Sequence, residues 1–319
     1  MSESKITVGL VGGRGHTGTA LARILFRHPR FHVAFVASST RGGEPAYAGE
    51  PGAPPGLCFE TLDADAVAAR GADAVVLALP NGLSMPVVSA TLKARPDTVL
   101  VDLSADHRFD GEWAYGLPEH HRASLGSARR IANPGCYATA TALVVRPLAA
   151  LLDGPAHVFG VSGVSGAGTT PHARNDMEAL RDNLMPYSLT GHVHEREVRR
   201  HAGSVRLMPH VAAFFRGLSV TVSMSFKEPM STDMLEDVYR RAYAGEPLVK
   251  LSREVPLLRD AVGQPWAAIG GYATDESERR GVVVATLDNL LKGAASQAVQ
   301  NLNLAFGLPE RMGIDPWQS

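Results

Sequence analysis

The amino-terminal part of the chain joins a strand, a glycine-rich loop and a helix in that order. Residues 5–12 form a continuous apolar run, which is typical of a strand buried on both faces of a parallel sheet. The run enters a loop that contains Gly12, Gly15 and Gly18, and residues 19–26 follow with helical spacing. Such glycines let the backbone approach a pyrophosphate, and the start of the helix faces that anion. The segment predicts a dinucleotide phosphate site, although G-x-x-G-x-x-G is not the commonest spacing and a structural tight turn is the alternative.

Beyond this segment the predicted elements follow two patterns. Apolar strands at residues 31–38, 73–79 and 98–103 alternate with helices, which indicates an α/β fold with a Rossmann-type doubly wound parallel sheet. After residue 156 the strands dominate, which indicates an α+β domain with a mostly antiparallel sheet. A long helix is expected over residues 288–305 and returns to the first domain.

The chain has 319 residues, which is long enough for two domains. We expect residues 1–135, completed by residues 288–319, to form an NADP-binding domain. Residues 136–287 are then a catalytic, substrate-binding and oligomerisation domain.

The end of the second predicted strand indicates which dinucleotide binds. An acidic residue there accepts from the ribose 2′-hydroxyl of NAD, whereas an arginine accommodates the 2′-phosphate of NADP. This chain has Ser38, Ser39 and Arg41, and no acid before Glu44. The pattern favours NADP over NAD, and a polar loop with one solvated arginine is the alternative.

Other loops are expected at the same carboxyl edge of the sheet. Pro80 and Asn81 end the strand of residues 73–79, and Ser165 and Gly166 belong to a glycine-rich loop that lacks the Lys-Ser/Thr ending of a P-loop. Asn289 opens the last predicted helix, where it could cap the helix or bind the cofactor's carboxamide. The predicted cofactor contacts are Gly12, Gly15, His16, Thr17, Gly18, Ser38, Ser39, Arg41, Pro80, Asn81, Ser165, Gly166 and Asn289.

A cysteine, Cys136, follows a Pro-Gly turn and heads a helix-patterned run that extends to about residue 151. A helix start favours the thiolate, which is the nucleophile, and its N–H groups can hold an oxyanion. We therefore expect Cys136 to attack an acyl group, and a cysteine that merely packs is the alternative. The other cysteine, Cys58, is expected to pack in the interior without a chemical role. Neither a disulfide nor a metal site is expected.

Polar residues near two predicted loops suggest further roles in catalysis. His192, His194 and Glu197 cluster at the start of a helix, which favours a general acid/base histidine steadied by a glutamate over a metal site or a solvated helix start. Arg108 follows a buried strand and could grip a phosphate or carboxylate with two hydrogen bonds, or form a surface ion pair with Asp110.

Composition gives no sign of a nucleic-acid or membrane partner. The formal net charge is −1, no apolar run is long enough to cross a membrane, and no signal peptide is evident. A small-molecule substrate and a cytoplasmic location are therefore expected.

Several motifs resemble one family along the whole chain. They are the glycine loop, Asp-Leu-Ser-Ala-Asp-His-Arg at 102–108, Tyr-Gly-Leu-Pro-Glu at 115–119, Asn-Pro-Gly-Cys-Tyr at 133–137, Ser-Gly-Val-Ser-Gly-Ala-Gly at 162–168, Pro-His at 209–210 with Arg-Gly at 216–217, and Asp-Asn-Leu-Leu-Lys-Gly-Ala-Ala at 288–295. The chain resembles the N-acetyl-γ-glutamyl-phosphate reductases and, more distantly, the aspartate-semialdehyde dehydrogenases. It departs from their pattern at Asn81, where a histidine is usual, and in His-Val-His-Glu, where His-Arg-His-Thr is usual.

The resemblance implies a reaction and a set of roles. Cys136 is the nucleophile, a histidine of residues 192–197 is the acid/base, and NADP lies over the glycine loop with Asn289 near the nicotinamide. The thiolate displaces phosphate from the acyl phosphate, NADPH reduces the thioester, and the semialdehyde leaves. The substrate contacts are Arg108, Asn133, His210 and Arg216.

Three questions stay open at the level of sequence. The acyl phosphate could instead be aspartyl phosphate or a carrier-bound aminoadipyl phosphate, or the protein could be a non-catalytic NADP-binding regulator. The sequence does not choose between His192 and His194 as the acid/base. We expect a homo-oligomer, either a dimer or a tetramer.

Overall fold

The computed structural model describes residues 5–314, and these form two compact units. The first unit holds the described residues up to Pro134 together with those from Ala294 onward, and the second unit is Gly135–Gly293. The sequence analysis assigned residues 288–293 to the nucleotide-binding domain, whereas the structure includes them in the second unit.

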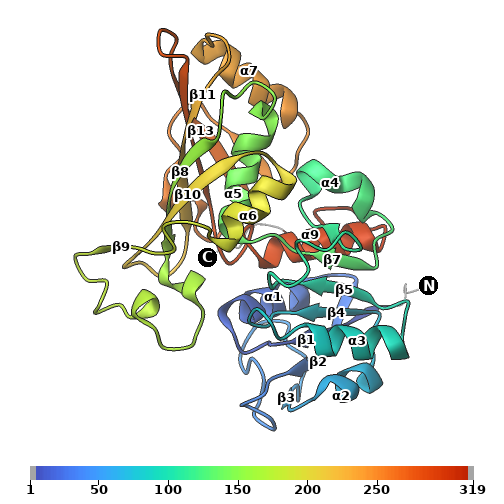
Figure 1. Cartoon of the computed structure of the whole chain (residues 1–319). Coiled ribbons are helices and arrows are strands. Elements are labelled where there is room, and N and C mark those ends of the chain that lie inside the picture. The colour runs from blue at the N-terminus through green and yellow to red at the C-terminus, as the bar shows by residue number, and fades with distance from the viewer. Residues whose placement is uncertain (1–4, 315–319) are drawn as a thin grey trace. The chain divides into compact units, whose positions relative to one another are not determined.

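The first unit contains a parallel sheet with the strand order β3-β2-β1-β4-β5-β7-β6 (Figure 1). Every paired strand in it runs parallel to its neighbours, so the predicted Rossmann-type sheet is confirmed. The strands are β1 (Ile6–Val11), β2 (Phe31–Ala37), β3 (Phe59–Glu60), β4 (Ala74–Leu77), β5 (Val99–Asp102), β6 (Ala114–Tyr115) and β7 (Arg130–Ala132). The helices are α1 (His16–Arg27), α2 (Ala64–Arg70), α3 (Met85–Ala94), α4 (Pro118–Leu125) and α9 (Ala295–Ala305).

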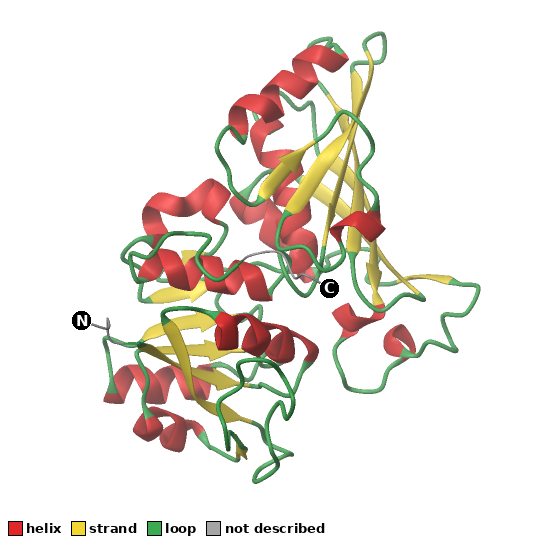
Figure 2. Ribbon diagram, turned by 180° about the vertical axis from the view of Figure 1, so that it is seen from behind, coloured by secondary structure: helices red, strands yellow, loops and turns green. Residues whose placement is uncertain are grey.

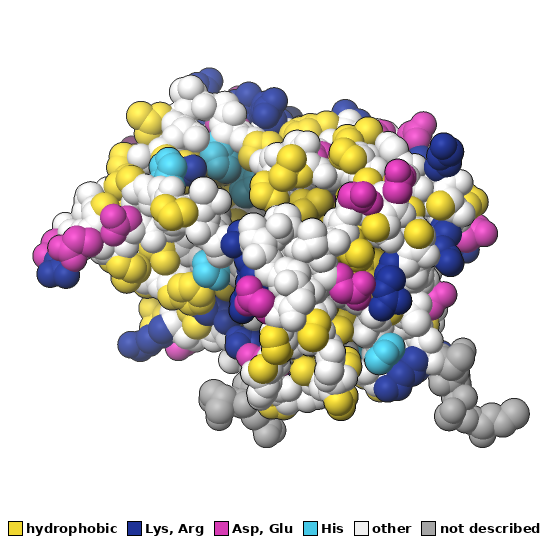
Figure 3. Space-filling view, turned by 90° about the horizontal axis from the view of Figure 1, so that it is seen from below, with side chains coloured by type: hydrophobic (Ala, Val, Ile, Leu, Met, Phe, Trp, Pro, Cys, Tyr) yellow, Lys and Arg dark blue, Asp and Glu magenta, His cyan; other side chains and the backbone are white. Residues whose placement is uncertain are grey.

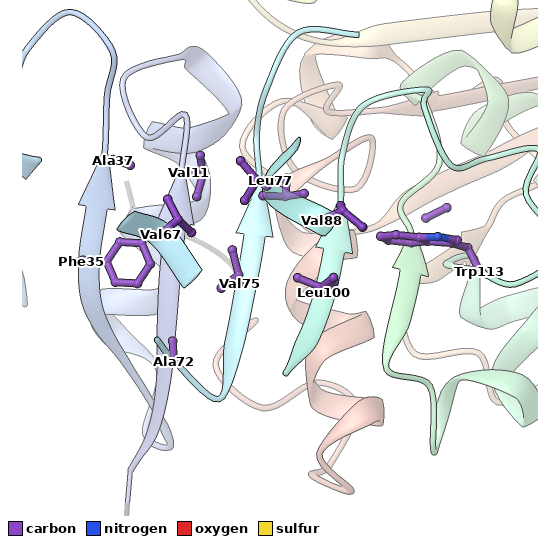
Figure 4. Close-up of a cluster of buried hydrophobic side chains, with 12 residues drawn as sticks. Val11, Phe35, Ala37, Val67, Ala72, Val75, Leu77, Val88, Leu100 and Trp113 are labelled. Carbon is purple, nitrogen blue, oxygen red and sulfur yellow. The ribbon is translucent and has the colours of Figure 1, made fainter. Parts of the chain in front are cut away.

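Apolar side chains from the strands and from α2 and α3 form the core on one face of this sheet. Phe35, Leu77 and Leu100 project from β2, β4 and β5, and Val67 of α2 and Val88 of α3 pack against this layer (Figure 4). Burial of such side chains contributes about 1.5–3 kcal/mol each, so this layer holds the strands in register. The carboxyl ends of β1 and β4 are thereby fixed beside the glycine loop.

Helix α9 returns to the first unit and packs beside α1. The buried His28 at the end of α1 lies 3.0 Å from the side-chain oxygen of Asn303 in α9 (Nε2 to Oδ1). The side chains of Gln297 and Asn301 both donate to the carbonyl of Gly116. The carboxyl-terminal helix therefore completes the amino-terminal fold.

The second unit contains a mixed sheet, drawn as yellow arrows in Figure 2. Its strand order is β12-β13-β14-β11-β8-β10-β9. Four of its pairings are antiparallel and two are parallel, so the prediction of a mostly antiparallel sheet is confirmed. The strands are β8 (Ala156–Gly163), β9 (Leu184–Pro186), β10 (Val205–Ala212), β11 (Leu218–Ser225), β12 (Val249–Leu251), β13 (Ala267–Asp275) and β14 (Arg280–Leu287). The helices are α5 (Cys136–Val145), α6 (Val193–His201), α7 (Thr232–Ala242) and α8 (Leu258–Ala261).

The two faces of this sheet differ. Helix α5 packs on one face, where the missing side chain of Gly160 makes room for the ring of Tyr137. Alternation along β8 turns Phe159 to the opposite face, where it is 42% exposed. Cys136 and Phe159 therefore belong to different faces of the second unit.

Two helices are shorter than their sequence patterns predict. Helix α5 ends at Val145, and a 3-10 turn at Arg146–Leu148 follows, because Pro147 cannot continue the α-helical hydrogen bonding. The prediction of one helix over residues 288–305 is wrong, since residues 288–294 precede α9 as a series of turns. These turns bring Gly293 so close to Cys136 that a Cβ at Gly293 would lie 2.7 Å from the cysteine Cβ.

Candidate active site

Cys136 is the first residue of α5 and is partly exposed. The preceding Gly135 is extended at the N-cap position, with φ −73° and ψ 153°, so the chain turns sharply into the helix. The N–H groups of the first turn are directed away from the helix, and its partial positive charge favours a thiolate there. The predicted nucleophile therefore occupies a helix start, where thiolate formation is favoured and backbone N–H groups are available as donors.

The buried side chain of Glu197, in α6, contacts the backbone of this turn. Its buried carboxylate accepts a hydrogen bond from the N–H of Gly135 at 3.0 Å (N to Oε1). Helix α6 is itself tied to β10, because Glu195 accepts from the N–H of Leu207 at 2.8 Å. The carboxylate that the sequence predicts to steady a histidine holds the backbone immediately before Cys136.

The two predicted histidines adjoin a pair of tyrosines. The ring centroids of His192 and His194 are 4.8 Å apart, and both rings lie within 6.3 Å of the Tyr137 ring. Tyr187, which follows β9, lies 5.6 Å from His192. These four rings form an aromatic group around the first turn of α5, which we call the ring cluster.

Local electrostatics keep the tyrosines of the ring cluster protonated. Burial raises the pKa of Tyr137, and the charges of Tyr187 and of a Cys136 thiolate raise it further. Burial also raises the pKa of Tyr187, the thiolate raises it further, and Arg174 lowers it. The Tyr137 hydroxyl donates to the carbonyl of His210 at 2.7 Å. Both tyrosines are therefore neutral hydrogen-bonding groups within the ring cluster.

His192 is held in one tautomer by its place in the helix. It is the N-cap residue of α6, and its Nδ1 accepts from the N–H of His194 at 3.1 Å. In the neutral ring the proton then resides on Nε2.

Three of the predicted cofactor contacts come together in the second unit. Asn289 donates to Ser165 Oγ at 2.9 Å and accepts from the N–H of Gly217 at 2.7 Å. A Cβ at Gly166 would lie 3.0 Å from Ser162 Oγ and 3.8 Å from the Asn289 amide. Asn289 precedes α9 and does not cap it; it joins two loops instead.

The predicted substrate residues of this unit lie apart from the ring cluster or are already paired. The His210 ring packs 4.5 Å from Phe159, on the sheet face opposite α5. Only the backbone carbonyl of His210 reaches Tyr137. The Arg216 guanidinium forms an ion pair with the buried carboxylate of Asp288 at 2.6 Å.

The glycine loop of the first unit has no room for a side chain at two of its glycines. Gly12 has φ +86°, and a Cβ there would collide with the carbonyl oxygen of Ala78. A Cβ at Gly18 would lie 2.6 Å from the carbonyl oxygen of Gly12. Gly15 differs, because a Cβ there meets nothing closer than 3.7 Å. Helix α1 starts at His16, earlier than expected, so His16 and Thr17 belong to its first turn.

The loops that follow β2 and β4 contain the remaining cofactor candidates. Ser38 is buried, Ser39 is exposed, and Arg41 forms an ion pair with Glu44 at 2.6 Å. Asn81 follows Pro80 and accepts from the N–H of Ala105 at 2.9 Å.

Arg108 and Asn133 form part of the interior of the first unit. Arg108 is buried and donates to the backbone carbonyls of Asn133 at 2.9 Å and Leu103 at 2.8 Å. The side-chain oxygen of Asn133 accepts from Asn301 of α9 at 3.0 Å. Within the described residues these contacts fix the strand end that leads to Pro134 and Cys136.

The sequence does not predict that Tyr137, Tyr187 or Arg174 belongs to the candidate site. Tyr137 is adjacent to Cys136 and reads as a core aromatic in a helix. Tyr187 and Arg174 lie in a segment with few patterned residues, where only the tertiary structure brings them to the ring cluster.

Neither a metal site nor a membrane span emerges from the described part of the chain. No group of three or more His, Cys, Asp or Glu residues that could hold a metal ion occurs in residues 5–314. The described helices include none that is long and apolar enough to cross a membrane. On the face shown in Figure 3, acidic and basic side chains are interspersed.

Comparison with known proteins places both units in one class. Residues 7–128 match the NAD-binding domain of the semialdehyde dehydrogenases, and residues 136–289 match their dimerisation domain. The fold is similar to that of aspartate semialdehyde dehydrogenase II from Vibrio cholerae complexed with ASA, with a TM-score of 0.76, 17% identity and coverage of 96% of this chain and 99% of that one. It is also similar to the Candida albicans aspartate semialdehyde dehydrogenase with NADP, with a TM-score of 0.71, 14% identity and coverage of 94% and 100%.

The fold and the matched domains thus define a semialdehyde dehydrogenase, an oxidoreductase with a nicotinamide-nucleotide domain. A relative from Stenotrophomonas maltophilia, an N-acetyl-gamma-glutamyl-phosphate reductase, is 52% identical over 321 residues, which cover 98% of this chain and 99% of the relative. The chain belongs to the N-acetyl-gamma-glutamyl-phosphate reductase family. The resemblance noted from the motifs is therefore confirmed, and the dimerisation domain supports oligomerisation through the second unit.

Proposed function

We propose that this protein reduces N-acetyl-γ-glutamyl phosphate to N-acetylglutamate semialdehyde with NADPH and releases phosphate, through a thioester on Cys136. The observation that supports the chemistry is the place of Cys136 as the first residue of α5, next to the ring cluster. The acyl specificity is supported by 52% identity to the reductase from Stenotrophomonas maltophilia over nearly the whole chain.

The glycine loop is our candidate for the pyrophosphate site. Gly12 and Gly18 have no room for a side chain, and the open space beside Gly15 lets the phosphates approach the start of α1. Arg41 is the proposed partner of the 2′-phosphate, which would compete with Glu44 for the guanidinium. NADPH, when bound, supplies the hydride that reduces the thioester carbonyl.

The residues around Cys136 then have distinct roles. The thiolate attacks the acyl carbon, the N–H groups of the first turn of α5 hold the oxyanion, and the carbon–oxygen bond to phosphate breaks. After reduction the carbon–sulfur bond of the hemithioacetal breaks, the sulfur receives a proton from a histidine, and the aldehyde leaves. Splitting one substitution into two steps lowers each barrier.

We assign the proton transfer to His194 and an orienting role to His192. Protonation of Nδ1 in His192 would break its cap on α6, so this ring acts as a fixed Nε2–H donor. Asparagine is itself a good N-cap residue. We therefore expect His192→Asn to keep most of the turnover and His194→Asn to lose it, and the opposite order would reverse the assignment.

We further propose that the protein forms a dimer through the sheet face that carries Phe159. Phe159 is 42% exposed there, and Val282 and Val284 of β14 project from the same sheet with partial exposure. Phe159→Glu should lower the association constant in sedimentation equilibrium, whereas an unchanged mass would exclude this face.

We place the enzyme in the cytoplasm, because a free reactive thiol persists in a reducing compartment.

The activity is tested in the reverse direction. Purified protein is mixed with NADP⁺ and N-acetylglutamate semialdehyde, with and without inorganic phosphate, and the formation of NADPH is followed. We expect reduction of NADP⁺ that depends on phosphate, with aspartate semialdehyde and carrier-bound aminoadipate semialdehyde much poorer substrates. The proposal fails if N-acetylglutamate semialdehyde is not the preferred aldehyde, or if no aldehyde supports turnover.

A further inference from the structure

Arg174 is an arginine whose charge faces an aromatic ring. Its guanidinium carbon lies 4.8 Å from the centroid of the Tyr187 ring, within cation–π distance. Within residues 5–314 it makes no ion pair, and only its backbone N–H is hydrogen-bonded, to His172 Nδ1. An arginine on a partly buried ring with no acidic partner is available to bind an anion.

The backbone that carries Arg174 is held in place. Residues Ala173–Asn175 form a 3-10 turn with a capping box between His172 and Asn175. The Asn175 amide donates to the carbonyls of Gly168 at 2.9 Å and Thr170 at 2.8 Å. The turn is thereby tied to the glycine-rich loop that contains Ser165, so Arg174 has a defined position.

Tyr187 connects Arg174 to the reacting centre. Its N–H donates to the carbonyl of Pro209 in β10 at 3.1 Å, and its ring lies 5.6 Å from His192. Within the ring cluster, Tyr187 forms a T-shaped contact with His192, and the Arg174 guanidinium lies over the same Tyr187 ring. The Tyr187 ring therefore contacts both the Arg174 guanidinium and the His192 ring of the ring cluster.

The proposed substrate carries two anionic groups at different distances from the reacting carbon. The phosphoryl group is attached to that carbon through one oxygen, whereas the α-carboxylate lies at the far end of a three-carbon chain. The guanidinium reaches the ring cluster through Tyr187 and not through a residue adjacent to Cys136, which favours the more distant group. Its planar fork also matches a carboxylate, which accepts two parallel hydrogen bonds.

We propose that Arg174, supported by the ring of Tyr187, binds the α-carboxylate of the substrate and makes the enzyme selective for acyl phosphates with an anion at that distance. This inference rests on the proposed function, because it concerns the substrate of the same site. It adds a specificity residue that no sequence motif indicated.

The test uses the reverse reaction, in which aldehyde and phosphate are separate substrates. Hydrogen bonds to charged groups contribute enough that Arg174→Gln should raise the KM for N-acetylglutamate semialdehyde by about 10- to 100-fold. The KM for phosphate and the KM for NADP⁺ should change less than about threefold, and kcat should stay within about fivefold. Arg174→Lys should restore part of the affinity, since it keeps the charge without the fork.

A matched control is Arg181→Gln in the same loop, because Arg181 is 69% exposed and pairs with Glu178 on the surface. It should leave all three KM values unchanged. A semialdehyde with its α-carboxylate amidated should be a poor substrate for the wild type and should be affected little further by Arg174→Gln.

The possible outcomes distinguish a failure of the role assigned to Arg174 from a failure of the proposed reductase activity. If Arg174→Gln raises the KM for phosphate rather than for the aldehyde, Arg174 binds the phosphoryl group and the inference is overturned. If all KM values are unchanged, Arg174 binds no substrate anion. If the wild type shows no phosphate-dependent turnover at all, the proposed function fails instead.

Discussion

The carboxylate of Glu197 accepts a hydrogen bond from the backbone N–H of Gly135, 3.0 Å away and one residue before Cys136. The carboxylate is fully buried, so loss of this acceptor would leave a buried N–H unsatisfied, at a cost of about 1–3 kcal/mol. The position of Cys136, the proposed nucleophile, thus depends on a side chain from another helix.

We expect Glu197→Ala to lower kcat at least tenfold and Glu197→Gln to lower it much less, because the amide oxygen still accepts from Gly135. The steady-state rate of NADPH-dependent reduction measures both losses, and circular dichroism checks that each variant is folded. If Glu197→Gln is as inactive as Glu197→Ala, the carboxylate does more than hold the turn.

The absence of a side chain at Gly293 is required by Cys136. A Cβ at Gly293 would lie 2.7 Å from the Cys136 Cβ and 2.7 Å from the carbonyl oxygen of Asn289. We expect Gly293→Ala to shift the cysteine and to lower kcat by at least tenfold. Gly126→Ala is the matched control, since a Cβ there meets no atom within 4 Å. Comparable activity of the two variants in the NADPH assay would contradict this account of the turn.

Gly15 tests the nucleotide site without disturbing the loop. A Cβ at Gly15 has open space around it, so Gly15→Ala should alter the thermal unfolding temperature little. The same methyl group would occupy the space proposed for the pyrophosphate. We expect the Kd for NADPH, measured by fluorescence titration, to rise about tenfold or more. Unchanged affinity would remove the glycine loop from the cofactor site.

A buried histidine should make folding of the first unit sensitive to acid. Burial lowers the pKa of His28 from its ordinary value of 6.5, and its Nδ1 accepts from the N–H groups of Arg30 and Phe31. Below about pH 6.5, His28 is protonated in the unfolded chain but stays neutral in the folded chain, so the free energy of unfolding falls as the pH drops. Chemical denaturation between pH 7.5 and about pH 5 measures this slope. His28→Gln, which cannot titrate, should show a shallower fall, and an equally steep one would assign the effect to other groups.

The sequence was informative where structure is local. The apolar run before Gly12 and the Pro-Gly turn before Cys136 predicted a strand and a helix start, and both occur, as β1 and the first residue of α5. Such signals depend only on neighbouring residues, through periodicity and turn geometry.

Features set by long-range packing were not predictable. The amphiphilic run at residues 288–305 reads as one helix, yet Asn289 bonds to Ser165 and Gly217, and Gly293 packs on Cys136, so the helix starts only at Ala295. The backbone carbonyl of His210 reaches Tyr137 beside Cys136, but strand alternation turns the His210 ring toward Phe159. Tertiary contacts override local preference in both cases.

The proposed chemistry requires that an acyl group is transferred to the sulfur of Cys136. Intact-protein and peptide mass spectrometry after mixing the enzyme with N-acetyl-γ-glutamyl phosphate, without NADPH, tests it directly. We predict one N-acetylglutamyl group on the peptide that contains Cys136, its loss on addition of NADPH, the same adduct in Cys58→Ser and none in Cys136→Ser. An enzyme that turns over while Cys136 stays unmodified, or a Cys136→Ser variant that keeps its activity, would contradict the account.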